Sequence, residues 1–365
     1  MEQFPPQPAP VRDRLAPAER RRAARHLLLD GFGLAAQERL AASRVVVVGA
    51  GGLGSPALQY LAAAGVGTLG IIDDDVVEAS NLQRQVLHSV ADVGRAKTAS
   101  ATDVLRGLAP DVEVIAHRER LTRDNAAAIL GGYHLVVDGS DTFETRYAVS
   151  DAAAALGLPV VWGTVLGWDG QVSVFWSAAP DGRGITYPDV FGPQPPEGES
   201  CATVGVLSPA CGVVGSTMAV EAVKVLTGTG DPALGRLLAH DARTSAWDTI
   251  ELAPAPSDPA GAPESSPAPA PGESGPTPSE PGRPSEPGRP GVLLLDVGLR
   301  PGAVPGAVCA RLEDLAAGNL PPELLDHPLD EPVVVVCERG LRSRGAEQLL
   351  RAEGWRDVTS RAILG

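Results

Sequence analysis

The stretch RVVVVGAGGLGS, residues 44–55, decides the fold of this chain. Its four valines form a buried-strand run, and the glycines that follow have G-x-G-x-x-G spacing, with Gly49, Gly51 and Gly54 at the fixed positions. The helical stretch SPALQYLAAA comes next and leads to a second apolar run, TLGIID, at 68–73. This order of strand, glycine turn, helix and strand is typical of the first unit of a nucleotide-binding α/β sheet.

The same alternation of apolar runs and helical stretches continues along the chain. Further buried-strand runs are VEVIAH at 112–117, HLVVD at 134–138 and LPVVWG at 158–163. QVSVFW at 171–176 alternates apolar and polar residues, which is typical of an antiparallel strand. The apolar stretch 206–226 predicts a buried helix, either in the core or at a subunit interface. The sequence therefore predicts a Rossmann-like, doubly wound, mainly parallel sheet with an antiparallel extension.

The glycine turn is a candidate phosphate site. Without side chains at Gly49, Gly51, Gly52 and Gly54, backbone amides at a helix N-terminus can approach phosphate oxygens, which the helix dipole attracts. Asp73 ends the second strand, where a carboxylate commonly binds ribose hydroxyls. Spacing alone indicates a nucleotide and not which one. A dinucleotide-dependent oxidoreductase and a glycine turn used only for packing both remain open.

A set of polar residues downstream bears on this choice. The set comprises Asn81, Arg84, Gln85 and Lys97 in one segment, and Asp138 and Asp141 after the fourth strand. Attack of a carboxylate on the α-phosphate of ATP builds charge that Arg and Lys stabilise, and an aspartate can hold a bridging Mg²⁺. Each residue alone could be a solvated loop charge or a helix cap. Together they favour adenylate chemistry.

Two long blocks carry a family resemblance. GAGGLGSPALQYLAAAGVGTLGIID and SNLQRQVLHSVADVGRAK resemble the ThiF/MoeB group of ubiquitin-activating-enzyme-like adenylyltransferases, over about residues 22–253. The resemblance implies ATP-dependent adenylation of the C-terminal Gly-Gly carboxylate of a small ubiquitin-like sulfur-carrier protein. It leaves little support for an oxidoreductase.

The resemblance also implies roles for single residues. By it, Asp73 binds ribose, Arg84 and Lys97 contact the triphosphate, and Asp141 supports Mg²⁺ and the adenylate. RAARHLLL resembles the family block whose arginine reaches the neighbouring subunit's ATP. Arg25 is therefore the residue expected to act in trans, and a homodimer is implied.

The C-terminal part carries a second motif, CERGLRS at 337–343, between a buried strand and a helix. Backbone amides and the helix dipole at such a junction stabilise a thiolate or persulfide. The motif resembles the rhodanese active-site loop, which implies that Cys337 carries sulfane sulfur and that Arg342 organises the loop. The whole chain then resembles the fused, MoeZ-type adenylyltransferase/sulfurtransferase, with a cysteine desulfurase or thiosulfate as sulfur donor.

Several residues depart from the family pattern. Thr142 follows Asp141 where the family usually has asparagine, and Thr186 and Asp189 replace a cysteine pair, so no structural zinc is expected. Cys201 matches a loop cysteine that takes part in acyl disulfide or persulfide exchange, although a structural thiol is the alternative. The sulfurtransferase-like part is also short. A non-catalytic or adenylation-only carrier-binding protein with a decayed second domain is therefore an alternative.

Composition shifts predict the domain organisation. The stretch 254–290 is almost entirely Pro, Ala, Gly, Ser and Glu, which is typical of an extended, semi-stiff linker. We expect a flexible N-terminal arm at 1–21, an adenylyltransferase domain at 22–253, this linker, and a small α/β rhodanese-like domain at 291–365.

Charge and cysteine content limit the partners and the location. The 365 residues carry a net charge of -15, which disfavours nucleic acid as a partner. We find no run of 18 apolar residues and no secretion signal, so we expect no membrane association and a cytoplasmic location. None of the four cysteines forms a C-x-x-C pair, and Cys211 and Cys309 are expected to be inert core thiols.

Overall fold

The computed structural model describes residues 15–193, 205–252, 292–298, 304–316, 318–337 and 341–362. The chain divides into two compact units, Met1–Pro256 and Ser257–Gly365. The expected linker at 254–290 and the candidate residue Cys201 lie outside the described residues.

An eight-stranded sheet forms the centre of the first unit, in the order β3-β2-β1-β4-β5-β6-β7-β8. The strands are β1 Arg44–Val48, β2 Thr68–Ile72, β3 Glu113–His117, β4 Leu135–Asp138, β5 Val160–Leu166, β6 Asp169–Phe175, β7 Arg236–Asp241 and β8 Ala246–Glu251. The strands from β3 to β5 are parallel, and those from β5 to β8 pair antiparallel. The predicted mainly parallel sheet with an antiparallel extension is confirmed.

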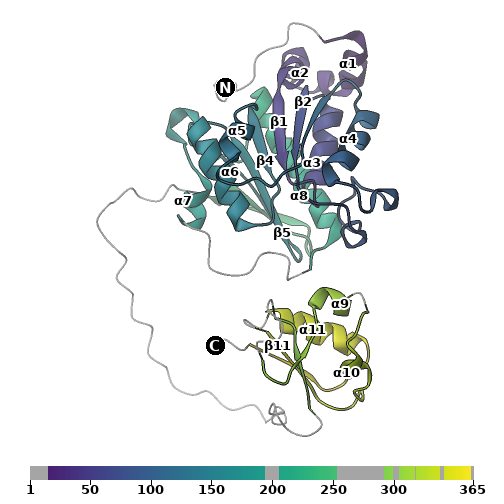
Figure 1. Ribbon diagram of the computed structural model, residues 1–365. Helices are drawn as coiled ribbons and strands as arrows, with labels where there is room; N and C mark the ends of the chain where they lie inside the picture. Colours follow the sequence, from purple (N-terminus) through teal and green to yellow (C-terminus); the bar gives the residue numbers. More distant parts are fainter. Residues whose placement is uncertain are drawn as a thin grey trace, which may run out of the picture. The chain divides into compact units, whose positions relative to one another are not determined.

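Helices cover both faces of this sheet, as in a doubly wound fold (Figure 1). On one side α3 packs against α4 and α8, and on the other α5 packs against α6. The helices are α1 Pro17–Arg22, α2 Gly33–Ala42, α3 Gly54–Ala64, α4 Lys97–Leu108, α5 Ala126–Leu130, α6 Phe143–Leu156, α7 Tyr187–Phe191 and α8 Ser208–Thr227. The valines of β1 are buried between these layers, which explains their continuous apolar run.

The helix α8 is the buried helix predicted from the apolar stretch 206–226. It packs against α2, α3, β5 and β6. Among the described residues it is the one helix with the length and hydropathy of a membrane span, but 61% of that window is buried inside the structure. Core helices of this kind meet the same criteria, so this is weak evidence for a membrane span.

The N-terminal segment differs from the expected flexible arm. Helix α1 begins at Pro17, and Leu15 just before it is buried. At the end of this helix, Arg22 forms a 3.1 Å ion pair with Asp111. Ordered structure therefore starts inside the stretch 1–21, because an apolar anchor and an ion pair hold it to the unit.

The second unit contains a four-stranded parallel sheet in the order β10-β9-β11-β12. Its elements are β9 Leu293–Asp296, β10 Val308–Cys309, α9 Leu312–Ala316, α10 Pro322–Leu325, β11 Val333–Cys337, α11 Leu341–Ala352 and β12 Val358–Ala362. The valines of β11 are buried in a small apolar core of their own. The predicted small α/β unit is confirmed.

The glycine turn in the first unit has no room for a side chain at Gly54. A Cβ at Gly54 would lie 1.8 Å from the carbonyl oxygen of Gly49, which is far below van der Waals contact. Gly49 itself has φ of +89°, a left-handed conformation that favours glycine. The close approach of helix to strand therefore requires the glycines read from the sequence.

Gly54→Ala is expected to lower the melting temperature by about 10 °C, because the new methyl group must displace backbone and not a movable side chain. Differential scanning calorimetry measures this. Gly107→Ala is the matched control, since Gly107 lies in α4 with no atom within 4 Å of the added Cβ. That control should raise the melting temperature by about 2 °C. A Gly54→Ala protein as stable as the control would contradict the close-packing argument.

Candidate functional site

The site lies between β1 and β4, where the order in which the chain adds strands to the sheet reverses. Val48 pairs with Asp138 at the carboxyl ends of these strands, and the chain leaves the two strands toward opposite faces. A Cβ at Gly49 would lie 3.3 Å from the carbonyl oxygen of Gly139, so the two loops that follow the strands are in contact. Doubly wound folds bind ligands in the crevice at such a switch point.

Asp73 follows β2 and supports the glycine loop. Its Oδ2 accepts the amide of Ala50 at 2.8 Å, and its Oδ1 accepts the amide of Asp75 at 2.9 Å. Burial raises the pKa of the Asp73 carboxyl, while Lys97 and these amides lower it. Each carboxylate oxygen keeps a further lone pair, so the group can still accept from a ribose hydroxyl.

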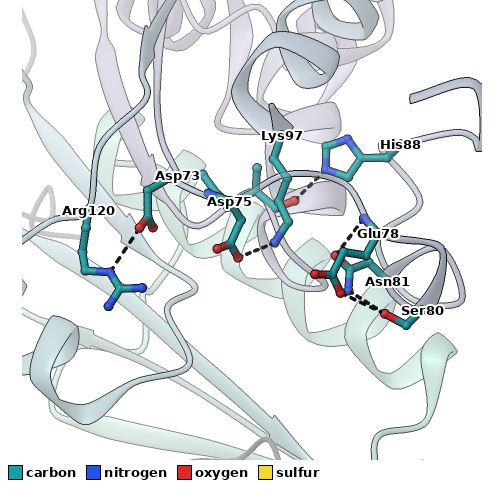
Figure 2. Close-up of polar contacts among 10 residues, drawn as sticks. Asp73, Asp75, Glu78, Ser80, Asn81, His88, Lys97 and Arg120 are labelled. Atoms are coloured by element: carbon teal, nitrogen blue, oxygen red, sulfur yellow. Dashed lines mark hydrogen bonds and ion pairs between the residues drawn. The ribbon is translucent and has the colours of Figure 1, made fainter. Parts of the chain in front are cut away.

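Cations flank a short acidic group formed by Asp73, Asp74 and Asp75, whose carboxylate oxygens lie within 4.8 Å of one another. Lys97, the first residue of α4, places its Nζ 2.8 Å from Asp75 (Figure 2). Arg120 approaches Asp74 at 3.2 Å. The Lys97 side chain is 7% exposed, whereas that of Asp75 is 61% exposed. Lys97 is thus a largely buried ammonium, and its ion-pair partner within the described residues is an exposed carboxylate.

The residues predicted between Asp73 and Lys97 line the other side of the glycine loop. Arg84 donates to the carbonyl of Ser80, and its Cγ lies 3.5 Å from the position of a Cβ on Gly52. The Gln85 amide nitrogen lies 3.6 Å from the corresponding position on Gly51. Gln85 is buried, and its Oε1 has no hydrogen-bond partner in the part of the chain that the structure describes. An unsatisfied buried acceptor beside the loop suits a ligand that brings a donor.

Asn81 comes earlier in the same segment, in a local cluster with Glu78 and Ser80 (Figure 2). Its Oδ1 accepts the amide of Glu78 at 3.4 Å, and its amide nitrogen donates to the Ser80 hydroxyl at 3.4 Å. These contacts are local. They hold the Asn81 side chain against its own turn, which also carries Arg84.

The loop after β4 carries two predicted carboxylates in different environments. Asp138 is fully buried, and burial raises its pKa, although the Ser140 amide and Arg146 act in the opposite direction. Asp141 is exposed. Thr142 caps α6 by accepting the Thr145 amide, so its side chain has a structural task in the family's asparagine position.

Arg146 is a buried cation that the sequence analysis missed. Its guanidinium donates to the carbonyl of Ser140 at 3.1 and 3.2 Å and to the Thr164 hydroxyl at 3.0 Å, and lies over the Trp162 ring. It thereby ties the loop between Asp138 and Asp141 to β5. In the sequence, Arg146 lies on an amphipathic helix with nothing to mark it as buried.

Three other predicted positions have plain structural surroundings. Arg25 is exposed in the 3-10 helix Ala23–Leu28. Thr186 and Asp189 form a reciprocal cap at the start of α7. Their side chains therefore stabilise a helix end in the family's cysteine positions.

The cysteines of the described ranges occupy three different settings. Cys211 is buried beneath Gly52, with its Sγ 3.1 Å from a Cβ placed there, and burial raises its pKa. This agrees with a core thiol. Cys309 is exposed, so its prediction as a core thiol is wrong, because β10 is a short edge strand with one side uncovered.

Cys337 ends the central strand β11 of the second unit, directly before the loop that leads to α11. Its Sγ accepts the backbone amide of Ser343 at 3.3 Å and lies 3.6 Å from the Ser343 hydroxyl. Arg342 is buried next to Ser343. The thiol is thus held against the N-terminal turn of α11.

These features define a class: a doubly wound α/β protein with a glycine loop, carboxylates and a buried lysine gathered at the switch point. The ThiF family model matches residues 23–260, and the chain belongs to the ThiF family.

Relatives and solved structures agree with this membership. A probable adenylyltransferase/sulfurtransferase MoeZ of Mycobacterium tuberculosis is 50% identical over 240 residues, which span 65% of this chain and 61% of that protein. The sulfur carrier protein adenylyltransferase of Thermus thermophilus is 49% identical over 231 residues, spanning 62% of this chain and 85% of that protein. The crystal structure of E. coli MccB with ATP shares the fold, with a TM-score of 0.56 at 19% identity, covering 65% and 73% of the two chains.

Asp73→Asn is expected to change how stability depends on pH. Because the folded-state pKa of Asp73 is raised, its charge costs stability near neutral pH, and this cost is relieved as pH falls through the raised value. The wild type should therefore gain stability relative to Asp73→Asn between pH 7 and pH 4. Melting temperatures of both proteins across this range measure the difference. A difference in melting temperature that does not change with pH would contradict a raised pKa of Asp73 in the folded protein.

Proposed function

We propose that this protein adenylates the C-terminal Gly-Gly carboxylate of a small ubiquitin-like sulfur-carrier protein and then transfers sulfur to it. The observation that carries the proposal is the gathering of Gly51, Gly52, Asp73, Arg84 and Lys97 at the switch point. Membership of the ThiF family and the printed activities of its relatives support the same function over a dinucleotide-dependent oxidoreductase.

The residues at the switch point suit ATP as the substrate. Loop amides from Gly49 to Gly54 would bind phosphate oxygens, since the glycines there leave the backbone uncovered by side chains. Asp73 would accept from the ribose, and Lys97 would leave Asp75 for the triphosphate. The Gln85 acceptor and the nearby Asn81 would face the nucleotide.

In the first step a carboxylate oxygen of the carrier attacks the α-phosphorus, and the bond to the β-phosphate oxygen breaks. The products are the acyl adenylate and pyrophosphate. Arg84 and Lys97 would stabilise the charge that grows on the departing pyrophosphate. Asp141 would hold Mg²⁺, which neutralises phosphate charge when bound.

A homodimer completes this proposal. The Arg25 side chain is exposed and would reach the nucleotide of the partner subunit. Two apolar side chains near it, Leu28 and Leu29, are 76% and 55% exposed, and burial against a second copy would remove them from water.

In the second step a persulfide on Cys337 attacks the acyl carbon and AMP leaves, which joins the carrier to Cys337 through an acyl disulfide. A thiolate, for which we propose Cys201, then attacks the Cys337 sulfur and releases the carrier thiocarboxylate. The resulting disulfide is reduced by an external thiol. Arg342 would organise the loop, and a cysteine desulfurase or thiosulfate would reload Cys337.

The two activities are assigned to separate parts of the chain. We assign adenylation to residues 22–253 and sulfur transfer to 291–365, joined by the linker 254–290. The hydrogen bond from the Ser343 amide to the Cys337 sulfur supports the assignment of sulfur transfer to residues 291–365.

Lys97→Ala and Asp141→Ala are expected to lower carrier-dependent ATP–pyrophosphate exchange at least 100-fold, since the first removes a cation that stabilises the departing pyrophosphate and the second removes the carboxylate proposed to hold Mg²⁺. Exchange of labelled pyrophosphate into ATP, with a Gly-Gly carrier present, measures this step. Lys224→Ala and Asp151→Ala are matched controls at the end of α8 and on α6, outside the switch point. Undiminished exchange in both site variants would refute the assigned site.

Cys337→Ser is expected to keep pyrophosphate exchange and to lose thiocarboxylate formation, because serine cannot carry sulfane sulfur. Mass spectrometry of the carrier, which gains 16 Da when oxygen is replaced by sulfur, measures the product. Cys309→Ser is the matched control, since Cys309 is an exposed thiol of the same sheet. Thiocarboxylate formed equally well by Cys337→Ser would favour the adenylation-only alternative.

A further inference from the structure

Ala50, inside the glycine loop, has both of its backbone polar groups bound by side chains from other segments. The Ala50 amide donates to Asp73 at 2.8 Å, and the Ala50 carbonyl lies 3.0 Å from Nε2 of His88. Both partners come from outside the loop: Asp73 follows β2, and His88 lies in the segment between the 3-10 helices Ala79–Asn81 and Val90–Asp92. The Ala50 carbonyl shares its peptide plane with the Gly51 amide, so holding this carbonyl sets the direction of that amide in the loop.

The ring of His88 has one protonation pattern that suits its partners. A carbonyl oxygen only accepts, so Nε2 carries hydrogen and donates to Ala50. Burial lowers the pKa of His88, which favours the neutral ring, and Nδ1 then accepts from the Ser100 hydroxyl at 2.9 Å. His88 is 7% exposed, so a nucleotide in the crevice would not need to touch the ring.

Ser100 connects this ring to the helix that carries the buried lysine. Ser100 lies on α4, one turn after Lys97, so His88 bridges the glycine loop and the start of α4. The charged groups that act on the ring are Lys97, Asp73 and Asp92. Asp92 stays ionised, because hydrogen bonds from the Ser89 hydroxyl and amide lower its pKa to about 2.

We propose that His88 is a positioning residue for the nucleotide: it fixes the Ala50 carbonyl so that the loop amides and Lys97 converge on the same phosphates. The inference rests on the proposed function. It assigns His88 a role in triphosphate binding through Ala50, without contact with the substrate.

Two neutral substitutions separate the two contacts of the ring. The glutamine amide reaches about as far as Nε2, so His88→Gln keeps a donor for the Ala50 carbonyl. The asparagine amide reaches about as far as Nδ1, so His88→Asn keeps a partner for Ser100 and leaves the Ala50 carbonyl unsatisfied. Calorimetric titration of the full-length protein with ATP gives the dissociation constants, and pyrophosphate exchange gives KM for ATP and kcat.

His88→Asn is expected to weaken ATP binding about tenfold and to raise KM for ATP more than it lowers kcat, since a buried acceptor loses its donor. His88→Gln should stay within about threefold of the wild type. His134→Gln is the matched control. His134 accepts the Arg44 amide at the amino end of β1, away from the glycine loop, so its loss should not change ATP affinity. Melting temperatures show whether any change in affinity follows stability alone.

Equal ATP affinities of His88→Asn and His88→Gln would overturn the positioning role, as would a tenfold loss in the His134→Gln control. Should His88→Asn fail to fold, Ser100→Ala provides the same test, with a roughly threefold weaker ATP affinity expected and an unchanged affinity overturning the role. A wild type that binds no ATP would instead refute the proposed function itself.

Discussion

The approach of Gly54 to the carbonyl of Gly49 is the contact on which the first unit depends. It lets α3 start directly against the end of β1, so that the helix N-terminus opens at the sheet edge. Without it, the loop would stand away from β4, and the carboxylates after β2 and β4 would no longer share one crevice. The backbone geometry at two glycines therefore sets the place of every charged group at the switch point.

Charge around this loop is arranged at a cost to stability. Asp73 and Asp138 are both carboxyl groups whose pKa burial raises, and Lys97 and Arg146 are cations that are largely buried beside them. Desolvated charges of this kind are tolerated where each has hydrogen-bond partners, and here backbone amides and carbonyls provide many of them. Perturbed groups gathered in one crevice are typical of functional sites.

Much of this organisation could be predicted from the sequence. Strand ends and glycine spacing predicted Gly49, Asp73 and Asp138 at one edge, because parallel strands bring their carboxyl ends together. His88 and Arg146 were not predicted as site residues, because their roles depend on contacts with Ala50 and Ser140 that sequence pattern and spacing do not encode.

The remaining differences also have local causes. Exposure of Cys309 follows from the edge position of β10, which no apolar run reveals. Order in the N-terminal segment depends on Leu15 and on the pairing of Arg22 with a distant aspartate. Each is a tertiary effect that overrides local composition.

The pairing of β1 with β4 has a consequence for how the crevice comes into being during folding. Val45 pairs with Leu135, so the glycine loop and its opposite wall belong to strands widely separated along the chain. Closing so long a loop is slow and yields its contacts late. The first strand–helix–strand unit is thus a local structure that can form early, yet a nascent chain ending before β4 would present a phosphate loop with one wall missing. The proposed nucleotide site therefore requires the sheet to be completed as far as β4. Residues 44–73 transplanted into another protein would not be sufficient to form it.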